Sequence, residues 1–384
     1  MFNRALGRSF RRYSTMTDPN KFIVPGKGVA NILVQESNDV LLNLATEEYL
    51  YEHCEIDNPV MFLWRNQRCV IIGKHQNPWK ELAVEKVNND DDIVLARRKS
   101  GGGCVYQDLG NAVFSFFTPV KDFQTSDYKT KNNEILIKSL EACGIYGAEA
   151  SGRNDMVIGD RKISGSAYKI NLGKADGSGK KALHHGTMLV DVDFSFLNDY
   201  LTPSKKKLES KGVNSVRSRV MNLSEVNPNI TYDMWMESMI NEFHNKHEDK
   251  DVFTKVIPEE QIRQVDKIME IYEGLNKWEW KYGTTPDFTH SIEHKFTWAL
   301  MDINFHVRKG LINSGKVYSD CLYPEFIDKI NGVLESPKDK VPYDKTGIRQ
   351  FCNILREELK EDEYYNDIYQ HNIDEIEELL VKEI

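Results

Sequence analysis

The amino-acid sequence predicts an α+β protein with two domains. The chain has 384 residues, 40% of them hydrophobic, which is enough for two hydrophobic cores. Short apolar runs bounded by glycine or polar residues, as strands are, are mixed with two longer segments whose apolar residues recur at helical spacing. A highly charged stretch at 245–260 indicates a connection between a larger amino-terminal part and a smaller carboxyl-terminal part.

The expected elements follow in order along the chain. A helix is expected at 39–54, strands at 60–64, 69–73, 93–96 and 112–117, and a second helix at 128–143 that stops at Gly144. Next come a hairpin of 156–158 and 162–167 with Gly159 in its turn, a flexible basic loop at 171–181 and a strand at 187–192. Residues 302–307 alternate between apolar and polar, as in a half-buried strand that turns back at Lys309 and Gly310. We therefore expect domains at 28–260 and 261–384, the second a small α+β unit with an acidic helical tail.

Composition argues against several classes of partner. The net charge is −9, and the tail 357–384, with eleven acidic residues and two lysines, accounts for all of it. The rest of the chain is balanced, so we expect no nucleic-acid partner. No apolar run approaches the ~18 residues of a membrane span, so we expect no membrane partner. The six cysteines are scattered without a Cys-x-x-Cys pair, which argues for a reducing compartment and leaves any metal ligand unknown.

Residues 1–17 differ from the rest of the chain. They contain four arginines and four serine or threonine residues, and no acidic residue. Wound as a helix, this segment places Phe2, Leu6 and Phe10 on one side. The pattern is typical of a mitochondrial transit peptide and predicts a matrix location. A disordered basic start is the alternative.

Segment 97–106 is the first of three clusters that indicate chemistry. It reads Arg-Arg-Lys-Ser-Gly-Gly-Gly-Cys-Val-Tyr and directly follows an expected strand. Consecutive glycines let the backbone approach a ligand and turn N–H groups towards it, and the basic triplet offers charge to a phosphate or carboxylate. The alternative is a tight turn. It is not a Walker A loop, because the spaced Gly-Lys-Ser/Thr is absent.

The other two clusters lie in the hairpin and the strand that follows it. Lys162 stands early in a hairpin strand before small residues, so its ammonium can reach a cleft and neutralise charge as a carboxylate attacks an α-phosphate. The alternative is a solvated edge lysine. His184 and His185 are adjacent in an extended segment and must point to opposite faces, so they do not easily share a metal. One can orient substrate while the other packs, or both can be structural.

Several long motifs, in order, resemble the lipoate–protein ligase A family. They are LWRNQRCVIIGKHQNPWKE, RRKSGGGCVYQDLGN, EASGRNDMVIGDRKISGSAYK, HHGTMLVDVD, KKKLESKGVNSVRSRVMNL and WEWKYGTTPDF. The similarity runs from about Asn31 to beyond Tyr323. It implies a biotin/lipoate-ligase-like catalytic domain with a mixed sheet and flanking helices, joined to the small α+β carboxyl-terminal accessory domain.

The resemblance also implies the substrates and partners. ATP, with Mg²⁺, would activate lipoate as lipoyl-AMP, and the lipoyl group would pass to a lysine on the lipoyl domains of 2-oxoacid dehydrogenase acyltransferase subunits or on the glycine cleavage H protein. We expect a monomeric chain. Lys162 falls on the family lysine that touches the acyl carboxylate and the nucleotide phosphate, and is the catalytic candidate. The candidate binding residues are Arg98, Ser100, Gly101, Gly102, Gly103, Cys104, Val105, Tyr106, Asn154, Asp155, Lys162, His184, Gly186 and Thr187.

Alternatives stay open at this stage. The enzyme can use free lipoate, or it can be a transferase of the same fold that takes pre-made lipoyl-AMP or an acyl-CoA; a catalytically silent binding module is the third possibility. Cys104 can be a thioester nucleophile or a small buried residue, and Gln107 stands where a histidine is common. An acyl slot can be lined by Trp64, Ile71, Ile72 and Val105, or these side chains simply fill the core. The basic segment 205–219 can steer an acidic acceptor domain, or be a solvated helix face.

Overall fold

The computed structural model describes residues 29–122, 127–152, 154–173, 179–201, 220–335, 340–361 and 365–384. The predicted transit peptide at 1–17 and the basic segment 205–219 lie outside the described residues, as does 174–178 of the predicted flexible loop. The described chain forms two compact units. The large unit contains residues 29–74, 91–199 and 220–276, and the small unit contains residues 75–90, 200–201 and 277–384.

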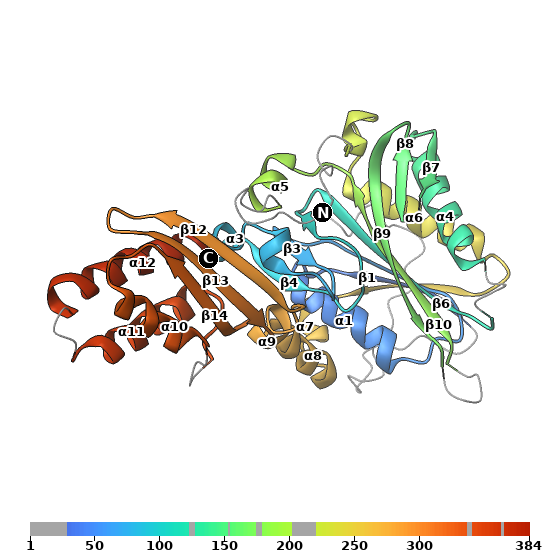
Figure 1. Cartoon of the computed structure of the whole chain (residues 1–384). Helices are drawn as coiled ribbons and strands as arrows, with labels where there is room; N and C mark the ends of the chain where they lie inside the picture. The colour runs from blue at the N-terminus through green and yellow to red at the C-terminus, as the bar shows by residue number, and fades with distance from the viewer. Residues whose placement is uncertain are drawn as a thin grey trace. The chain divides into compact units, whose positions relative to one another are not determined.

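A mixed sheet forms the centre of the large unit (Figure 1). Within the described part it has eight strands in the order β11-β1-β2-β6-β10-β9-β8-β7. Their bounds are β1 Ala30–Gln35, β2 Val60–Trp64, β6 Asn111–Pro119, β7 Ala148–Ser151, β8 Asp155–Ile158, β9 Arg161–Asn171, β10 Lys181–Leu189 and β11 Val252–Ile257. Strand β1 is parallel to β2 and β11, and the other neighbours are antiparallel. A second sheet, β4-β3-β5, contains Cys69–Ile72 (β3), Val94–Arg97 (β4) and Val105–Gln107 (β5).

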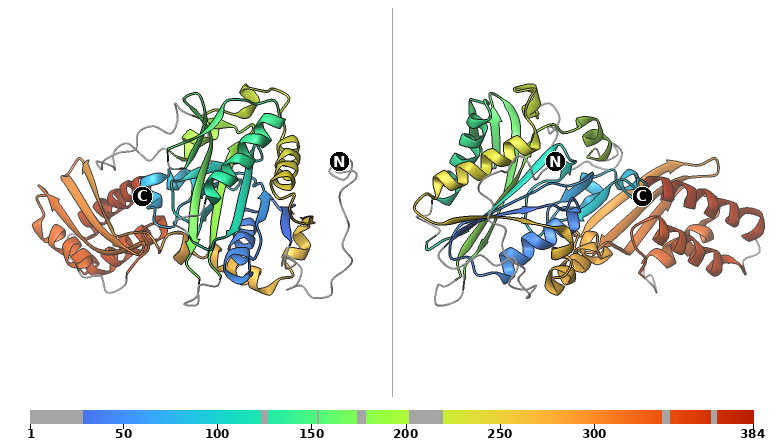
Figure 2. Two further views of the ribbon diagram at one scale, coloured as in Figure 1. Left: turned by 90° about the vertical axis from the view of Figure 1, so that its right-hand side faces the viewer. Right: turned by 180° about the vertical axis from the view of Figure 1, so that it is seen from behind.

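Helices of the large unit cover these sheets. They are α1 Val40–His53, α4 Tyr128–Ala142, α5 Phe194–Tyr200, α6 Tyr232–Lys246, α7 Glu259–Ile262 and α8 Asp266–Asn276, with a 3₁₀ turn at Leu223–Glu225. Asp39 caps α1, since its side chain accepts the N–H groups of Leu41 and Leu42 at 2.9 and 3.3 Å. Helices α4 and α6 lie side by side on the large sheet and share its apolar core (Figure 2). The predicted helices at 39–54 and 128–143 are thus confirmed to within a residue at each end.

Two expectations about organisation need correction. The stretch 245–260 is not only a connection, because β11 within it pairs with β1 as the edge strand of the large sheet. The charged residues around it mask the apolar side chains that enter the core, such as Val256 and Ile257. The predicted strand at 187–192 begins earlier, at Lys181, because β10 pairs along its length with both β6 and β9.

The two compact units also divide the chain differently from the predicted 28–260 and 261–384. Helix α8 belongs to the large unit, where it packs against α1. Residues 75–90, from the middle of the amino-terminal half, belong to the small unit. The indole of Trp79 lies there against the rings of Tyr282, Phe288 and Tyr343, with centroids 5.3–5.5 Å apart.

The small unit has its own sheet and core. Strands β12 Phe288–Lys295, β13 Leu300–Arg308 and β14 Leu311–Ser319 form an antiparallel sheet. The helices are α2 Pro78–Glu81, α3 Val84–Asn88, α9 Trp278–Lys281, α10 Pro324–Glu335, α11 Lys345–Leu359 and α12 Gln370–Glu383, with a π-helical turn at Tyr365–Tyr369. The turn predicted at Lys309 and Gly310 is confirmed, with both residues at positive φ. The acidic tail packs through Ile373, Ile376 and Leu380, as its helical spacing predicts.

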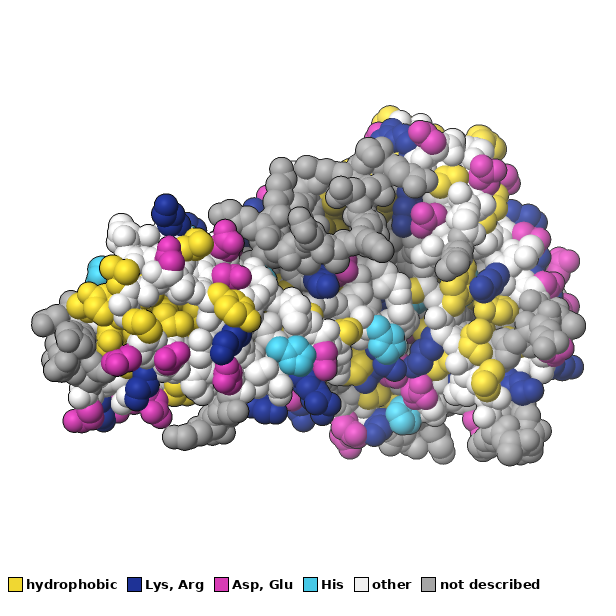
Figure 3. Space-filling view, viewed as in Figure 1, with side chains coloured by type: hydrophobic (Ala, Val, Ile, Leu, Met, Phe, Trp, Pro, Cys, Tyr) yellow, Lys and Arg dark blue, Asp and Glu magenta, His cyan; other side chains and the backbone are white. Residues whose placement is uncertain are grey.

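The face of the molecule seen in Figure 3 carries side chains of both charges on its described parts. Basic and acidic side chains are intermixed there on the described parts of the molecule. This agrees with the balanced charge of the chain before its acidic tail. Within the described residues, no helix is both long enough and apolar enough to cross a bilayer.

Candidate active site

The glycine-rich segment connects the two outer strands of the small β4-β3-β5 sheet. Strand β3 pairs with β4 on one side and β5 on the other, so residues 98–104, here called the glycine loop, cross the end of β3. There the N–H of Lys74 donates to the carbonyl of Ser100 at 2.8 Å. A Cβ on Gly73 would lie 2.2 Å from the carbonyl oxygen of Gly102. Only glycine at 73 therefore allows the loop to lie this close to the end of β3.

The guanidinium of Arg98 lies at the centre of this loop. It donates from Nη2 to the carbonyls of Gly101 and Gly103 at 2.6 and 2.8 Å, and from Nη1 to that of Ile71 at 3.3 Å. The residue is 8% exposed, and burial is the largest effect lowering its pKa. Arg97 is also buried, and donates to the carbonyls of Gly73 and Lys74. In this structure the donors of both arginines bind loop and strand carbonyls, and their contact with a ligand stays a prediction.

The same contacts turn the loop N–H groups the other way. In a trans peptide the C=O of one residue and the N–H of the next point in opposite directions. The carbonyls of Gly101 and Gly103 face Arg98, so the N–H groups of Gly102 and Cys104 point away from it. Gly102 has φ 92°, and a Cβ there would lie 2.7 Å from Nη2 of Arg98, so glycine is required. All three glycines are exposed, and this geometry suits an anion.

Lys162 reaches the same region because β9 carries a β-bulge. Val157 of β8 pairs with Lys162, whereas its neighbour Met156 pairs with Ser164, so one residue of β9 is extra. A bulge changes which face the following side chains take. Lys162 Nζ lies 2.7 Å from Oδ1 of Asp155, and both side chains are about one-third exposed. The bulge thus places the ammonium of Lys162 beside Asp155 rather than on the opposite face.

Close packing over β9 explains the small residues that follow Lys162. A Cβ on Gly165 would lie 2.9 Å from Lys162 Nζ, so glycine leaves room for the lysine side chain. A Cβ on Gly102 would lie 3.6 Å from Cβ of Ala167, which follows Gly165 by two residues on β9. The glycine loop and Lys162 therefore share one face of β9. Thr187 pairs with Gly165 and is partly buried on this face.

The structure separates the two histidines of β10 onto opposite faces, as expected. His184 is fully buried between the rings of Tyr168 and Phe114, and its Nε2 lies 2.9 Å from Oγ of Ser166. Burial, with a smaller repulsion from His185, lowers the pKa of His184 to about 3, so its ring is neutral. The structure thus puts this predicted site residue in the core, away from the face that carries Lys162.

His185 is the histidine that reaches the glycine loop. Its Nε2 lies 2.7 Å from Oγ of Ser100, and its Nδ1 lies 2.8 and 3.0 Å from the carboxylate oxygens of Glu47 on α1. Burial by itself raises the pKa of Glu47, but the charge and hydrogen bond of His185, with that of Ser115, lower it below the ordinary value. Sequence reasoning missed Glu47 and did not choose His185. Their only signal was a glutamate between apolar residues of a predicted helix.

The remaining predicted residues take less central places. The side chain of Asn154 donates to the carbonyl of Ser166 and is exposed. A Cβ on Gly186 would lie 2.6 Å from a ring carbon of Phe114, so this glycine serves close packing. Cys104 is partly buried, as is Val105. Gln107 is buried, and its Oε1 accepts from Asn66 at 2.6 Å, which gives it a structural role in place of a histidine. Of the proposed acyl-slot residues, three are core side chains: Trp64, Ile71 and Ile72.

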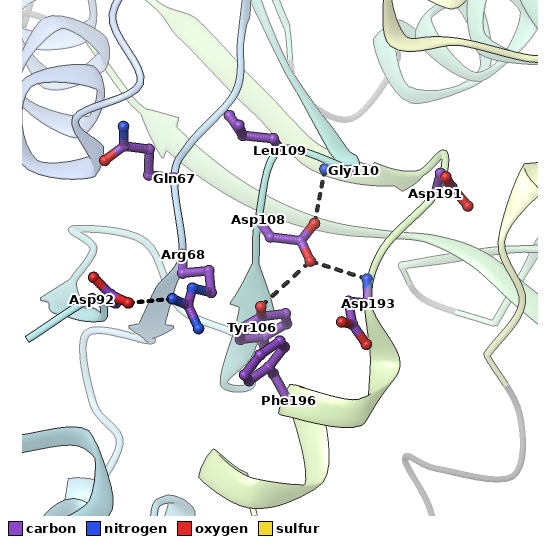
Figure 4. A pocket seen from close by; sticks show the side chains of 10 residues that line it. All are labelled: Gln67, Arg68, Asp92, Tyr106, Asp108, Leu109, Gly110, Asp191, Asp193 and Phe196. Carbon is purple, nitrogen blue, oxygen red and sulfur yellow. Dashed lines mark hydrogen bonds and ion pairs between the residues drawn. The ribbon is translucent and has the colours of Figure 1, made fainter. Parts of the chain in front are cut away.

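A pocket of about 560 Å³ lies beside β5 in the large unit (Figure 4). Its lining is Gln67, Arg68, Asp92, Tyr106, Asp108, Leu109, Gly110, Asp191, Asp193 and Phe196. Arg68 pairs with Asp92 at 2.6 Å, and Asp108 accepts the N–H groups of Gly110 and Asp193. Four carboxylates against one guanidinium repel a triphosphate. The glycine loop and Lys162 therefore suit an anion better than this pocket does.

Comparison with known proteins identifies the family. A model of the lipoyl protein ligase A/B catalytic domain matches residues 39–244, and one of the bacterial lipoate protein ligase C-terminus matches residues 285–380. A lipoate-protein ligase A of Bdellovibrio bacteriovorus is 40% identical over 308 residues, covering 79% of this chain and 86% of that protein.

Solved structures agree with this assignment. The P. falciparum LipL1 complex with lipoate is 28% identical, covers 92% of this chain and 99% of that one, and has a TM-score of 0.55. A bi-partite lipoate protein ligase of Thermoplasma acidophilum, studied with its E2 lipoyl domain, is 25% identical, covers 66% and 95%, and also has a TM-score of 0.55. The matched models and the close bacterial relative show that this chain belongs to the lipoyl protein ligase A/B family, with the C-terminal domain of the bacterial ligases.

Proposed function

We propose that this ligase joins lipoate and ATP into lipoyl-AMP and then transfers the lipoyl group to a lysine of an acceptor protein. The acceptors would be the lipoyl domains of 2-oxoacid dehydrogenase acyltransferase subunits and the glycine cleavage H protein. The observation that supports this most is the shared face of β9, on which Lys162 lies together with a loop whose N–H groups point away from Arg98. A cation and backbone donors together suit a phosphate next to a carboxylate. The relatives named above include a lipoate complex and a ligase studied with a lipoyl domain.

The chemistry has two steps. A lipoate carboxylate oxygen attacks the α-phosphorus of ATP, the bond to the bridging oxygen breaks, and pyrophosphate leaves. The acceptor amine then attacks the acyl carbonyl and loses a proton, and AMP leaves as the amide forms. The ammonium of Lys162 neutralises charge on the phosphate in both steps, and the loop N–H groups hold the nucleotide. Asp155, 2.7 Å from Nζ, holds the ammonium in place until the substrate arrives.

Metal binding is assigned to the nucleotide. Among the described residues, no group of three or more His, Cys, Asp or Glu side chains is placed to hold a metal ion. Mg²⁺ commonly binds substrate phosphates with only one or two carboxylates. We therefore treat Mg²⁺ as part of the ATP substrate and assign no step to a metal on the protein.

Pyrophosphate release tests the proposal directly. Purified chain mixed with ATP, Mg²⁺ and lipoate should release pyrophosphate and, on addition of an apo lipoyl domain, produce AMP and a lipoylated lysine in equal amounts. The transferase alternative predicts the opposite pattern, with transfer from supplied lipoyl-AMP or acyl-CoA and no pyrophosphate from ATP. No transfer from any donor would leave only a binding role.

A further inference from the structure

A continuous chain of buried polar side chains runs beneath the glycine loop. It starts at Glu47 on α1, passes through His185 on β10 and Ser100 in the loop, and ends at the guanidinium of Arg98. The links measure 2.8, 2.7 and 3.1 Å, and each residue is less than 9% exposed. Three elements that are far apart in sequence therefore meet at one loop.

The hydrogen-bond roles limit what Ser100 can do. Arg98 can only donate, so its Nε–H is accepted by Oγ of Ser100. The other close partner of Oγ is Nε2 of His185. With Glu47 on the far side of the ring, the three side chains have the order of a hydrolase triad, but Ser100 is 4% exposed and its oxygen faces inward. Ser100 is thus placed to hold the loop rather than to attack a substrate.

The place of this chain of hydrogen bonds in the fold is unusual for a purely structural feature. Buried charged groups cost desolvation, and apolar residues of similar volume often stabilise a core at least as well. Here the chain ends on the residue whose donors turn the loop carbonyls inward and the N–H groups of Gly102 and Cys104 outward. A displacement of Ser100 would therefore shift the guanidinium of Arg98. That shift would in turn reorient those peptide planes.

We propose that Glu47 and His185 are positioning residues for the nucleotide-binding loop and act on it through Ser100. The proposal rests on the adenylate-forming function proposed above. Glu47 fixes the ring orientation of His185, His185 fixes the Ser100 hydroxyl, and Ser100 fixes the Nε of Arg98. The loop N–H groups are thereby set in direction before ATP binds.

Two substitutions of His185 separate positioning from packing. The amide nitrogen of asparagine takes the place of Nδ1, so His185→Asn keeps the bond to Glu47 and loses the bond to Ser100. Glutamine reaches the Nε2 position, so His185→Gln keeps Ser100 and loses Glu47. If His185 positions the loop, His185→Asn should reduce loop order and raise the KM for ATP more than His185→Gln does. Unfolding stability should suffer more in His185→Gln, because that variant leaves the buried carboxylate of Glu47 without its ring partner.

The measurements are hydrogen exchange of the peptide 97–107, KM for ATP in pyrophosphate release, and urea unfolding. In His185→Asn we expect exchange and KM to rise about tenfold, the size expected for one buried hydrogen bond to a charged network. In His185→Gln both should change by less than about threefold, since the link to Ser100 remains. Adding His185→Asn to Ser100→Ala should cause little further change in the loop, because the link from His185 to the loop is already lost with the Ser100 hydroxyl. Ser139→Ala, which removes another fully buried serine hydroxyl within α4, should leave exchange of 97–107 unchanged.

Positioning would be supported if His185→Asn has the larger effect on the loop and His185→Gln has the larger effect on unfolding stability. The same ranking in both, or additive effects of Ser100→Ala and His185→Asn, would overturn it. Hydrogen exchange is measured without substrate, so it decides the point even if the wild-type chain releases no pyrophosphate. That second result would contradict the proposed function alone.

Discussion

The β8–β9 hairpin and the glycine loop each place a cation at the same face of the sheet, but in opposite ways. Lys162 on the hairpin is one-third exposed and holds a single carboxylate, that of Asp155. Arg98 in the loop is buried, and its N–H groups go to three backbone carbonyls and one hydroxyl. An exposed ammonium with one partner can exchange that partner for a substrate, whereas a buried guanidinium cannot leave its acceptors without unfolding the loop. We therefore expect Lys162 to be the reactive cation and Arg98 the structural one.

Removing the reactive cation should have the largest effect on catalysis. We expect Lys162→Ala to lower the rate of adenylate formation by on the order of 3 kcal/mol in the transition state, about a hundredfold or more, with unfolding stability nearly unchanged. Single-turnover pyrophosphate release checks the rate. Lys169→Ala is the matched control, since Lys169 lies on the same strand but pairs with Glu48 and Glu52. Near-normal turnover in Lys162→Ala would remove this lysine from the active site.

Removing the structural cation should appear first in stability. Arg98→Ala leaves the carbonyls of Ile71, Gly101 and Gly103 without a donor, so we expect a loss of about 2–3 kcal/mol in the free energy of unfolding. Urea denaturation measures this. Arg161→Ala, which breaks a largely exposed pair with Glu225, should cost less than about 1 kcal/mol. If Arg98→Ala unfolds at the wild-type urea concentration while ATP binding is lost, Arg98 contacts the nucleotide instead, and the comparison is reversed.

The smallest expected effect concerns the buried face behind Lys162. The pKa of His184 is about 3 in the folded chain and near 6.5 when unfolded. Between these values the unfolded state binds more protons, so His184 makes stability fall as the pH drops below about 6.5 and has no effect above it. The slope approaches about 1.4 kcal/mol per pH unit at most. Urea unfolding at pH 7, 6 and 5 should show a shallower decline in His184→Gln than in the wild type. Equal declines would mean that this ring is not held neutral.

Much of the architecture was predictable because local patterns set it. Helix α1 begins at a capping aspartate, and α4 ends before a glycine with positive φ. The glycine loop and Lys162 were identifiable mainly through the family resemblance of their motifs, since a tight turn and a solvated edge lysine explain the local pattern as well. By contrast, β11 was not recognised, because a short edge strand surrounded by charges has no periodic signal of its own.

The sequence by itself determined the family, several of the elements in their order, and the two segments that we propose form the site. Only the tertiary structure decided what each polar side chain does there. Whether an arginine is reactive or structural depends on which carbonyls surround it, and here those belong to residues that β3, β4 and β5 bring together. Which of two adjacent histidines reaches the loop depends on strand pairing, and the aim of Lys162 depends on one extra residue in β9. These outcomes follow from contacts between residues distant in sequence, and local periodicity carries no information about them.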